Sequence, residues 1–416
     1  MLRVSEGNMP VYAAAQLRLC WKLGGWSLPS LQGKLRYSFL HFLSSAPEAT
    51  LHCAEALCRP LPEIRAALAP EISECRRLLQ ALESEQGVAV SMEGDVACAA
   101  EASFERLHAG DVWQCARPLA CDIRQLFDVR VHEQLLQGQC WPPVDHTFHA
   151  ARLRALEGEI SGRALVDHPS SSGEPLASAR QWVLAGKFRL GIKLGVTRCG
   201  LSTKEGERCA CVLDAWGSHA LGCGQGVLVT ARHAAFRRFG YDIGRLCGFA
   251  ALTEQCIPQL GVVCKKRKQP DGTVLQCWES AYVDVLLTAH PAEGDRLLDV
   301  TWRSPFAADV LQRSAKQAGA AAALGERDKA KRYPAVGEVH VECWSCEITG
   351  RAGEPLSHAL KQMATLAAEV QAERGYKASD WAQLWRGKLS GLAHRLLGQA
   401  LDRAYALQIA GDRELV

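Results

Sequence analysis

The sequence has little net charge and no long apolar run. Its 416 residues carry a formal net charge of only +3. Such a chain is no general binder of polyanions, so any surface for nucleic acid has to be a local basic patch. No stretch of about 18 apolar residues occurs, and no membrane-spanning helix is therefore expected. Arg3, Glu6 and Pro10 interrupt the N-terminal apolar residues, which excludes a signal-peptide pattern.

Cysteine, in contrast, is abundant. The 18 cysteines are scattered and lie mostly in apolar helical patterns. Because no secretory signal accompanies them, they indicate reduced thiols in the nucleus or the cytoplasm rather than a disulfide framework. A few of them are expected to bind metal.

Hydropathy patterns divide the chain into four regions. Residues 1–166 are predicted to be mainly helical, and the helical pattern begins abruptly at Met1, as in a fragment of a longer parent. After a linker rich in Ser, Gly and Pro at 167–175, a cysteine-rich region is predicted at 176–247, a strand-rich core at 248–350 and C-terminal helices at 351–416. The expected fold is mixed α/β (α+β), and its elements are predicted to follow one another as strand, strand, helix, strand and helix.

The strongest metal motif in the sequence consists of Cys209, Cys211, His219 and Cys223. Thiolates with an imidazole suit tetrahedral Zn²⁺, and four protein ligands leave no open position, so a structural zinc knuckle is predicted. The Cys-x-Cys spacing is tighter than in most zinc fingers, and Cys199 and His233 are substitute ligands. The alternative interpretation is a cysteine-rich surface loop without a metal.

Two aspartates occur inside short apolar runs of strand length. Asp284 lies in the run 282–287 and Asp299 in the run 297–302, with a turn predicted at 291–295. A carboxylate in an apolar strand is costly to bury unless a partner or a cation compensates its charge. Adjacent antiparallel strands would bring both together as a Mg²⁺ site for phosphoryl chemistry. The alternative is that each aspartate lies on the solvent side of a half-exposed strand.

Two further residues are candidates for this site. Lys329 follows the Ala-rich helix predicted at 307–324, and a lysine near a metal could orient the attacking water and offset phosphate charge. Alternatively, it belongs to a solvated basic helix end. Glu254 precedes the acidic strands and could complete the metal shell, or it is simply an exposed glutamate.

A basic cluster is formed by Lys265, Lys266, Arg267 and Lys268. Pro-Asp-Gly follows at 270–272 and favours a turn, so a hairpin with a basic tip is predicted. The cluster could contact nucleic-acid phosphates or serve in nuclear import. The alternative is a solvated hairpin tip.

With these residues in place, roughly residues 185–350 resemble the C-terminal region of non-LTR retrotransposon proteins that carry a restriction-like endonuclease. The matching positions are Leu190, Gly191, Ile192, Cys209, Cys211, Asp214, Gly217, 219–223, Arg232, His233, Glu254, Asp284, 299–301, Pro305, Lys329 and Tyr333. The resemblance implies a PD-(D/E)XK-type core at 248–350 that nicks DNA with Mg²⁺. It also implies that Asp284 and Asp299 are metal ligands, that Lys329 is the catalytic lysine, and that Tyr333 is its companion.

The chain departs from that family at one signature. The family's Arg-Pro-Asp is replaced by Tyr282-Val283-Asp284, which favours a second hypothesis, a catalytically inactive, zinc-stabilised nucleic-acid-binding module. A third is a structural protein from a decaying reading frame. No Tyr/Phe-x-Asp-Asp polymerase signature occurs, so residues 1–166 are interpreted as the segment that followed a reverse transcriptase. DNA is the expected partner, with element RNA as a further one.

Overall fold

The computed structural model describes residues 12–13, 16, 22–24, 132–138, 145–163, 178–195, 199, 201, 209, 211–223, 227–268 and 274–413. The side chains at 264–268, 274–276 and 405–413 are outside this description, as are the predicted linker and most of the region 1–166. The chain forms two compact units, of which one comprises Met1–Trp26 and Gln134–Val416 and the other Ser27–Glu133. The elements α6 to α13 and β1 to β6 belong to the first unit. The predicted divisions near residues 176, 248 and 351 stay predictions.

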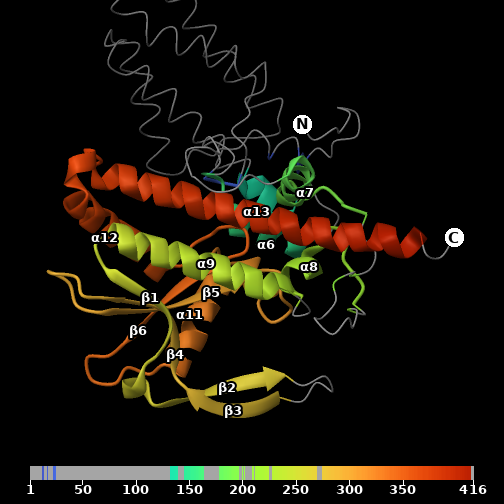
Figure 1. Ribbon diagram of the computed structural model, residues 1–416. Coiled ribbons are helices and arrows are strands. Elements are labelled where there is room, and N and C mark those ends of the chain that lie inside the picture. The colour runs from blue at the N-terminus through green and yellow to red at the C-terminus, as the bar shows by residue number, and fades with distance from the viewer. Residues whose placement is uncertain are drawn as a thin grey trace, which may run out of the picture. The chain divides into compact units, whose positions relative to one another are not determined.

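A four-stranded mixed sheet lies at the centre of this unit (Figure 1), in the order β1-β4-β5-β6. Its strands are β1 (Ala250–Cys256), β4 (Tyr282–Thr288), β5 (Arg296–Arg303) and β6 (Val341–Glu347). Strand β4 is antiparallel to both β1 and β5, while β6 is parallel to β5. The predicted mixed α/β fold is confirmed at this level, as is the antiparallel pairing of the two strands that carry the aspartates.

Helices cover both faces of the sheet. They are α6 (His146–Leu156), α7 (Ala179–Arg189), α8 (Ser218–Gly222), α9 (Val227–Leu246), α10 (Leu311–Ser314), α11 (Ala320–Arg332), α12 (Glu354–Val370) and α13 (Ala378–Arg413), with 3₁₀ turns at Pro258–Leu260 and Ala372–Arg374. Successive residues of a strand point to opposite faces. Leu298 and Val300 of β5 join a buried cluster with α9, α12 and α13, whereas Thr301 lies under Gly325 of α11. In the part of the chain that is described, no helix is long and apolar enough to cross a membrane.

The crossover from β5 to the parallel strand β6 corrects one sequence prediction. The Ala-rich helix predicted at 307–324 is interrupted, because Gly319 adopts a φ of 78° and α11 begins only after it. Glycine takes this left-handed conformation without the clash that a Cβ would cause. Helix α11 then continues through Lys329 to Arg332, so Lys329 lies inside the helix and not behind it.

A second, two-stranded sheet is the predicted hairpin. Strands β2 (Val262–Lys268) and β3 (Val274–Ser280) pair antiparallel and form a ribbon that Figure 1 shows at the end of the unit remote from α13. Ala281 connects β3 directly to β4, and hydrogen bonds between Ala281, Ile257 and Gly261 close the base of the ribbon. The basic cluster lies within strand β2, next to the turn and not at its tip.

Candidate zinc centre and acidic site

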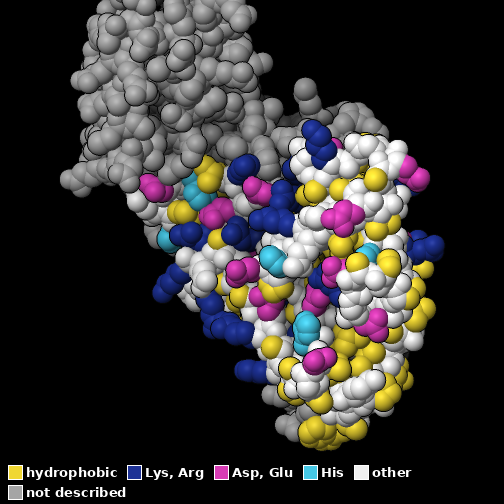
Figure 2. Space-filling model, turned by 90° about the vertical axis from the view of Figure 1, so that its left-hand side faces the viewer, with side chains coloured by type: hydrophobic (Ala, Val, Ile, Leu, Met, Phe, Trp, Pro, Cys, Tyr) yellow, Lys and Arg dark blue, Asp and Glu magenta, His cyan; other side chains and the backbone are white. Residues whose placement is uncertain are grey.

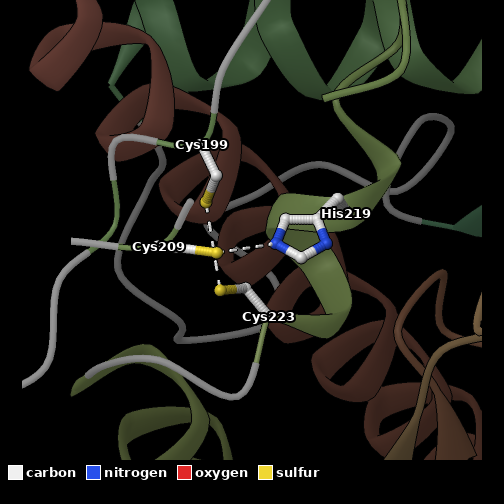
Figure 3. Close-up of side chains that lie close together, drawn as sticks. All are labelled: Cys199, Cys209, His219 and Cys223. Carbon is white, nitrogen blue, oxygen red and sulfur yellow. Dashed lines mark hydrogen bonds between the residues drawn. The ribbon is translucent and has the colours of Figure 1, made fainter. Parts of the chain in front are cut away.

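Three thiols and one imidazole meet beside α8 (Figure 3). The ligand atoms of Cys199, Cys209, His219 and Cys223 all lie within 4.8 Å of one another. The sulfur of Cys199 is 3.9 Å from that of Cys223, and the sulfur of Cys209 is 3.3 Å from Nε2 of His219. Zinc–sulfur bonds of about 2.3 Å in a tetrahedron place neighbouring sulfur atoms about 3.8 Å apart. The four groups could therefore hold a zinc ion.

Local backbone structure positions these ligands. Cys199 and Cys209 lie on two facing segments, which are joined by hydrogen bonds from the Cys199 N–H to the Cys211 carbonyl and from the Cys209 N–H to the Leu201 carbonyl. His219 lies on the short helix α8, whose start is held by Asp214. The Asp214 carboxylate accepts hydrogen bonds from the N–H groups at positions 216, 218 and 219, as a residue ahead of a helix commonly does.

The cluster differs from the predicted ligand set at one position. Cys211 is exposed and does not belong to the group of four, and its carbonyl accepts the hydrogen bond from the Cys199 N–H. Cys199 is 4% exposed and completes the cluster from ten residues upstream of Cys209. The sequence motif named Cys199 only as a substitute, because the pairing of the two segments is a tertiary feature. His233, the other substitute, lies at the acidic site instead.

The two aspartates lie where strands β4 and β5 separate. The backbone ladder ends at the pair Val285–Leu298, and Asp284 and Asp299 are the next positions in register. The N–H of Val300 donates to Oδ2 of Asp284 at 2.7 Å, so this carboxylate fills the opening between the strands. The carboxyl groups of Asp284 and Asp299 lie close enough to shift each other's pKa, and Asp299 is buried. Neither aspartate lies on a solvent-facing strand surface.

Each carboxylate has its own basic neighbour. Nζ of Lys329 donates to both oxygens of Asp299, at 2.7 and 2.6 Å. Nε2 of His233 lies 2.7 Å from Oδ1 of Asp284. Since the lysine comes from α11 and the histidine from α9, helices on opposite faces of the sheet meet the carboxylates at the same point.

The two aspartates differ in their affinity for protons. Burial and the neighbouring Asp284 raise the pKa of Asp299 while Lys329 lowers it, and the net result is a pKa of about 7. Burial also raises the pKa of Asp284, but hydrogen bonds with His233, Asp299 and Val300 outweigh it and bring the pKa below its usual range. Without a cation, Asp284 therefore loses its proton more readily than Asp299.

Glu254 and Tyr333 occupy different positions around this pair. The register of β1 places Glu254 opposite Asp284, and its φ of 54° is unusual for a residue other than glycine. Its side chain pairs with Arg237 of α9. The hydroxyl of Tyr333 donates to the carbonyl of Tyr282 at 2.9 Å, and burial, with the nearby charge of Asp299, raises its pKa. Tyr333 thus ties the end of α11 to the start of β4.

A cavity of about 350 Å³ lies between α8 and His233, the residue that pairs with Asp284. Its lining includes Gly222 beside the zinc ligands, His233 of the acidic site, Thr301, Arg303, Ser304 and Leu324. Gly222 lies against Ser304, so the zinc-binding segment forms one wall of the cavity. Of the residues at the acidic site, His233 lines this cavity, whereas Asp284 and Asp299 do not.

Sequence reasoning missed the role of His233 next to Asp284. The available signal was the helical spacing of His233 and Arg237, which places both on the face of α9 that meets Asp284 and Glu254. For the cluster Lys265, Lys266, Arg267 and Lys268, the structure gives the backbone of β2 but no side chains.

No family model matches the chain, and no curated protein matches it either. The resemblance to retrotransposon endonucleases therefore rests on the residues quoted for it above.

Proposed function

We propose that the chain is a Mg²⁺-dependent DNA endonuclease, derived from a non-LTR retrotransposon, that nicks DNA by hydrolysing a phosphodiester bond. The observation that carries this proposal is the meeting of Asp284, Asp299 and Lys329, which come from three separate elements. Buried carboxylates are costly, and such a group with a perturbed pKa is found at functional sites more often than elsewhere. The resemblance to the PD-(D/E)XK-type nucleases supports the same conclusion.

The residues present fit a hard divalent cation. Asp284 and Asp299 offer adjacent carboxylate oxygens, which are the donors that Mg²⁺ prefers. When bound, Mg²⁺ would supply stabilisation of the charge that develops on the phosphate. Lys329 would orient the attacking water and add positive charge, while His233 and the Val300 N–H hold Asp284 in place.

The zinc cluster has a structural role in this proposal. Four protein ligands leave no position for water or substrate, which is typical of structural Zn²⁺. The ion would fix the segment that ends at Gly222 and so form one wall of the cavity beside the acidic pair. A nuclear or cytoplasmic setting, in which thiols stay reduced, suits these ligands.

A second candidate function is a zinc-stabilised nucleic-acid-binding module from a decayed retroelement, without catalysis. The observation that favours it is the engagement of both Asp299 oxygens by Lys329, which competes with a metal for the same atoms. Tyr282 and Val283 also stand where the nuclease family carries Arg and Pro. Such a module would hold DNA, or element RNA, without cutting it.

A plasmid-nicking assay distinguishes the two. Supercoiled plasmid with Mg²⁺ is expected to be nicked by the wild type, and Asp284→Asn or Asp299→Asn should reduce the rate at least about 100-fold, since each removes a metal ligand. EDTA should abolish nicking altogether. The matched control is Asp295→Asn, because Asp295 is exposed in the turn between the same strands. A plasmid that is bound but never cut would contradict catalysis and support the second candidate.

A further inference from the structure

The β2–β3 ribbon carries an exposed aromatic side chain that none of the described residues of the unit covers. Trp278 is 68% exposed and Val262 is 60% exposed. The ladder pairs Cys264 with Trp278 and Val262 with Ser280, so these positions share one face of the ribbon. Figure 2 shows hydrophobic side chains gathered at the lower end of that view, at the level of the ribbon in Figure 1. An exposed tryptophan of this size indicates a surface for a partner.

The opposite face of the ribbon is fixed to the core at its base. Val263 is 3% exposed and packs in a cluster with Ile257, Leu260 and Ala281. The ribbon is therefore anchored on the Val263 face, while the Trp278 face stays open to a partner.

Charge determines which kind of partner fits the open face. Strand β2 contains four consecutive basic residues in a strand of seven, and positions 266 and 268 belong by register to the face of Trp278. Two copies of such a ribbon would repel each other. Duplex nucleic acid, in contrast, offers phosphates to the basic residues, and base edges with thymine methyl groups in its major groove to the aromatic ring.

We propose that the β2–β3 ribbon is a docking arm for duplex DNA, with Trp278 as its central contact. A two-stranded ribbon fits the major groove of B-form DNA, which is about 12 Å wide. The proposal rests on the proposed function, because its ligand is the DNA on which the acidic site would act.

The covalent path from the arm to the acidic site is short. Asp284 follows Trp278 by six positions, and Ala281 joins the two strands without a loop. At about 3.3 Å per residue, the arm contacts DNA within about 20 Å of the acidic pair. This distance corresponds to about six base pairs at 3.4 Å each. The arm would therefore set the position of the nick relative to the groove that it occupies.

Fluorescence anisotropy with a labelled 30-base-pair duplex tests the arm. Measurement in EDTA separates binding from cleavage. Trp278→Ala is expected to raise the dissociation constant about tenfold, the size expected for loss of one good contact with base edges in the major groove. Lys266→Gln with Lys268→Gln should reduce the slope of log K against log salt by about two, since two phosphate contacts are lost. Tyr376→Ala is the matched control, because Tyr376 is an aromatic residue 53% exposed outside the ribbon.

Several results would contradict the proposal that the ribbon binds duplex DNA. Unchanged affinity in both ribbon variants would do so, as would a wild type that does not bind duplex DNA. A wild-type dimer that Trp278→Ala converts to a monomer would assign the face to self-association. Tight binding that depends on Trp278, together with no plasmid nicking in Mg²⁺, would overturn the proposed catalysis while leaving the arm in place.

Discussion

Replacement of single cysteines tests which thiol completes the zinc centre. The sulfur of Cys199 is buried and lies 3.9 Å from that of Cys223. Cys211, in contrast, is exposed, and its backbone carbonyl takes part in the pairing of the two segments. Cys199→Ser should therefore remove a direct ligand, while Cys211→Ser should leave all four in place. The two variants make the same chemical change in two facing segments, so each is the control for the other.

The magnitude follows from the geometry. Loss of a partner that only supports a ligand already costs about 10- to 100-fold in metal affinity. Loss of a ligand itself should reach at least about 100-fold, which corresponds to about 3 kcal/mol of binding free energy. Because the cluster around Cys199 also includes Leu201 and Leu213, a serine hydroxyl there is poorly solvated and destabilises the apo form as well.

The assay is competition for Zn²⁺ with a chromogenic chelator, followed by thermal unfolding with and without EDTA. The wild type and Cys211→Ser should bind one zinc per chain and lose stability in EDTA. Cys199→Ser should lose its zinc to a weaker chelator, and its unfolding temperature should change little when EDTA is added. The reverse ranking of the two variants would refute the cluster and restore Cys211 as the fourth ligand. Absence of zinc from the wild type would refute the centre as a whole.

Two further predictions concern a buried histidine and the position of Lys329, the proposed catalytic lysine. His394 is fully buried, no described residue hydrogen-bonds either ring nitrogen, and burial lowers its pKa from 6.5 to about 3. The stability that this group contributes is present above pH 6.5 and is lost as the pH falls toward 3. Between pH 8 and pH 5 the wild type should therefore lose about 2 kcal/mol more of its free energy of unfolding than His394→Leu, as measured by urea titrations at the two pH values. An unchanged difference would contradict the burial argument. Gly325 lies one turn before Lys329, and a Cβ there would be 2.9 Å from Thr301. Gly325→Leu should displace α11 and abolish nicking, while the helical content measured by circular dichroism stays unaltered. The control Ala330→Leu, at an exposed position of the same helix, should keep its nicking activity. Full activity of Gly325→Leu would contradict the proposed role of Lys329.

The strands were predictable because each carries its own local signal. The runs at 282–287 and 297–302 are apolar, β-branched and of strand length, and the intervening turn residues make them antiparallel neighbours. The hairpin was equally visible from Pro-Asp-Gly. Helix α11 was misplaced because alanine favours a helix on either side of Gly319, and the sequence alone does not reveal that this glycine adopts a positive φ.

The candidate sites were predictable only in part. The sequence supplied the ligand types, and the cost of burying a carboxylate in an apolar strand marked Asp284 and Asp299. It did not reveal the partner of either one. His233 is 51 residues from Asp284 along the chain, and Lys329 is 30 residues from Asp299, so no short-range pattern links them.

The sequence by itself therefore determined the chemistry that is available: thiols and an imidazole for zinc, two carboxylates in neighbouring strands, and a basic hairpin. The tertiary structure decided which groups meet. It placed Cys199 in the zinc cluster in place of Cys211 and directed Glu254 to Arg237. It also set Lys329 inside α11, against Asp299. The physical reason is that strand and helix patterns depend on neighbours in sequence, whereas a site is assembled from side chains that only the packing of distant segments brings within bonding distance.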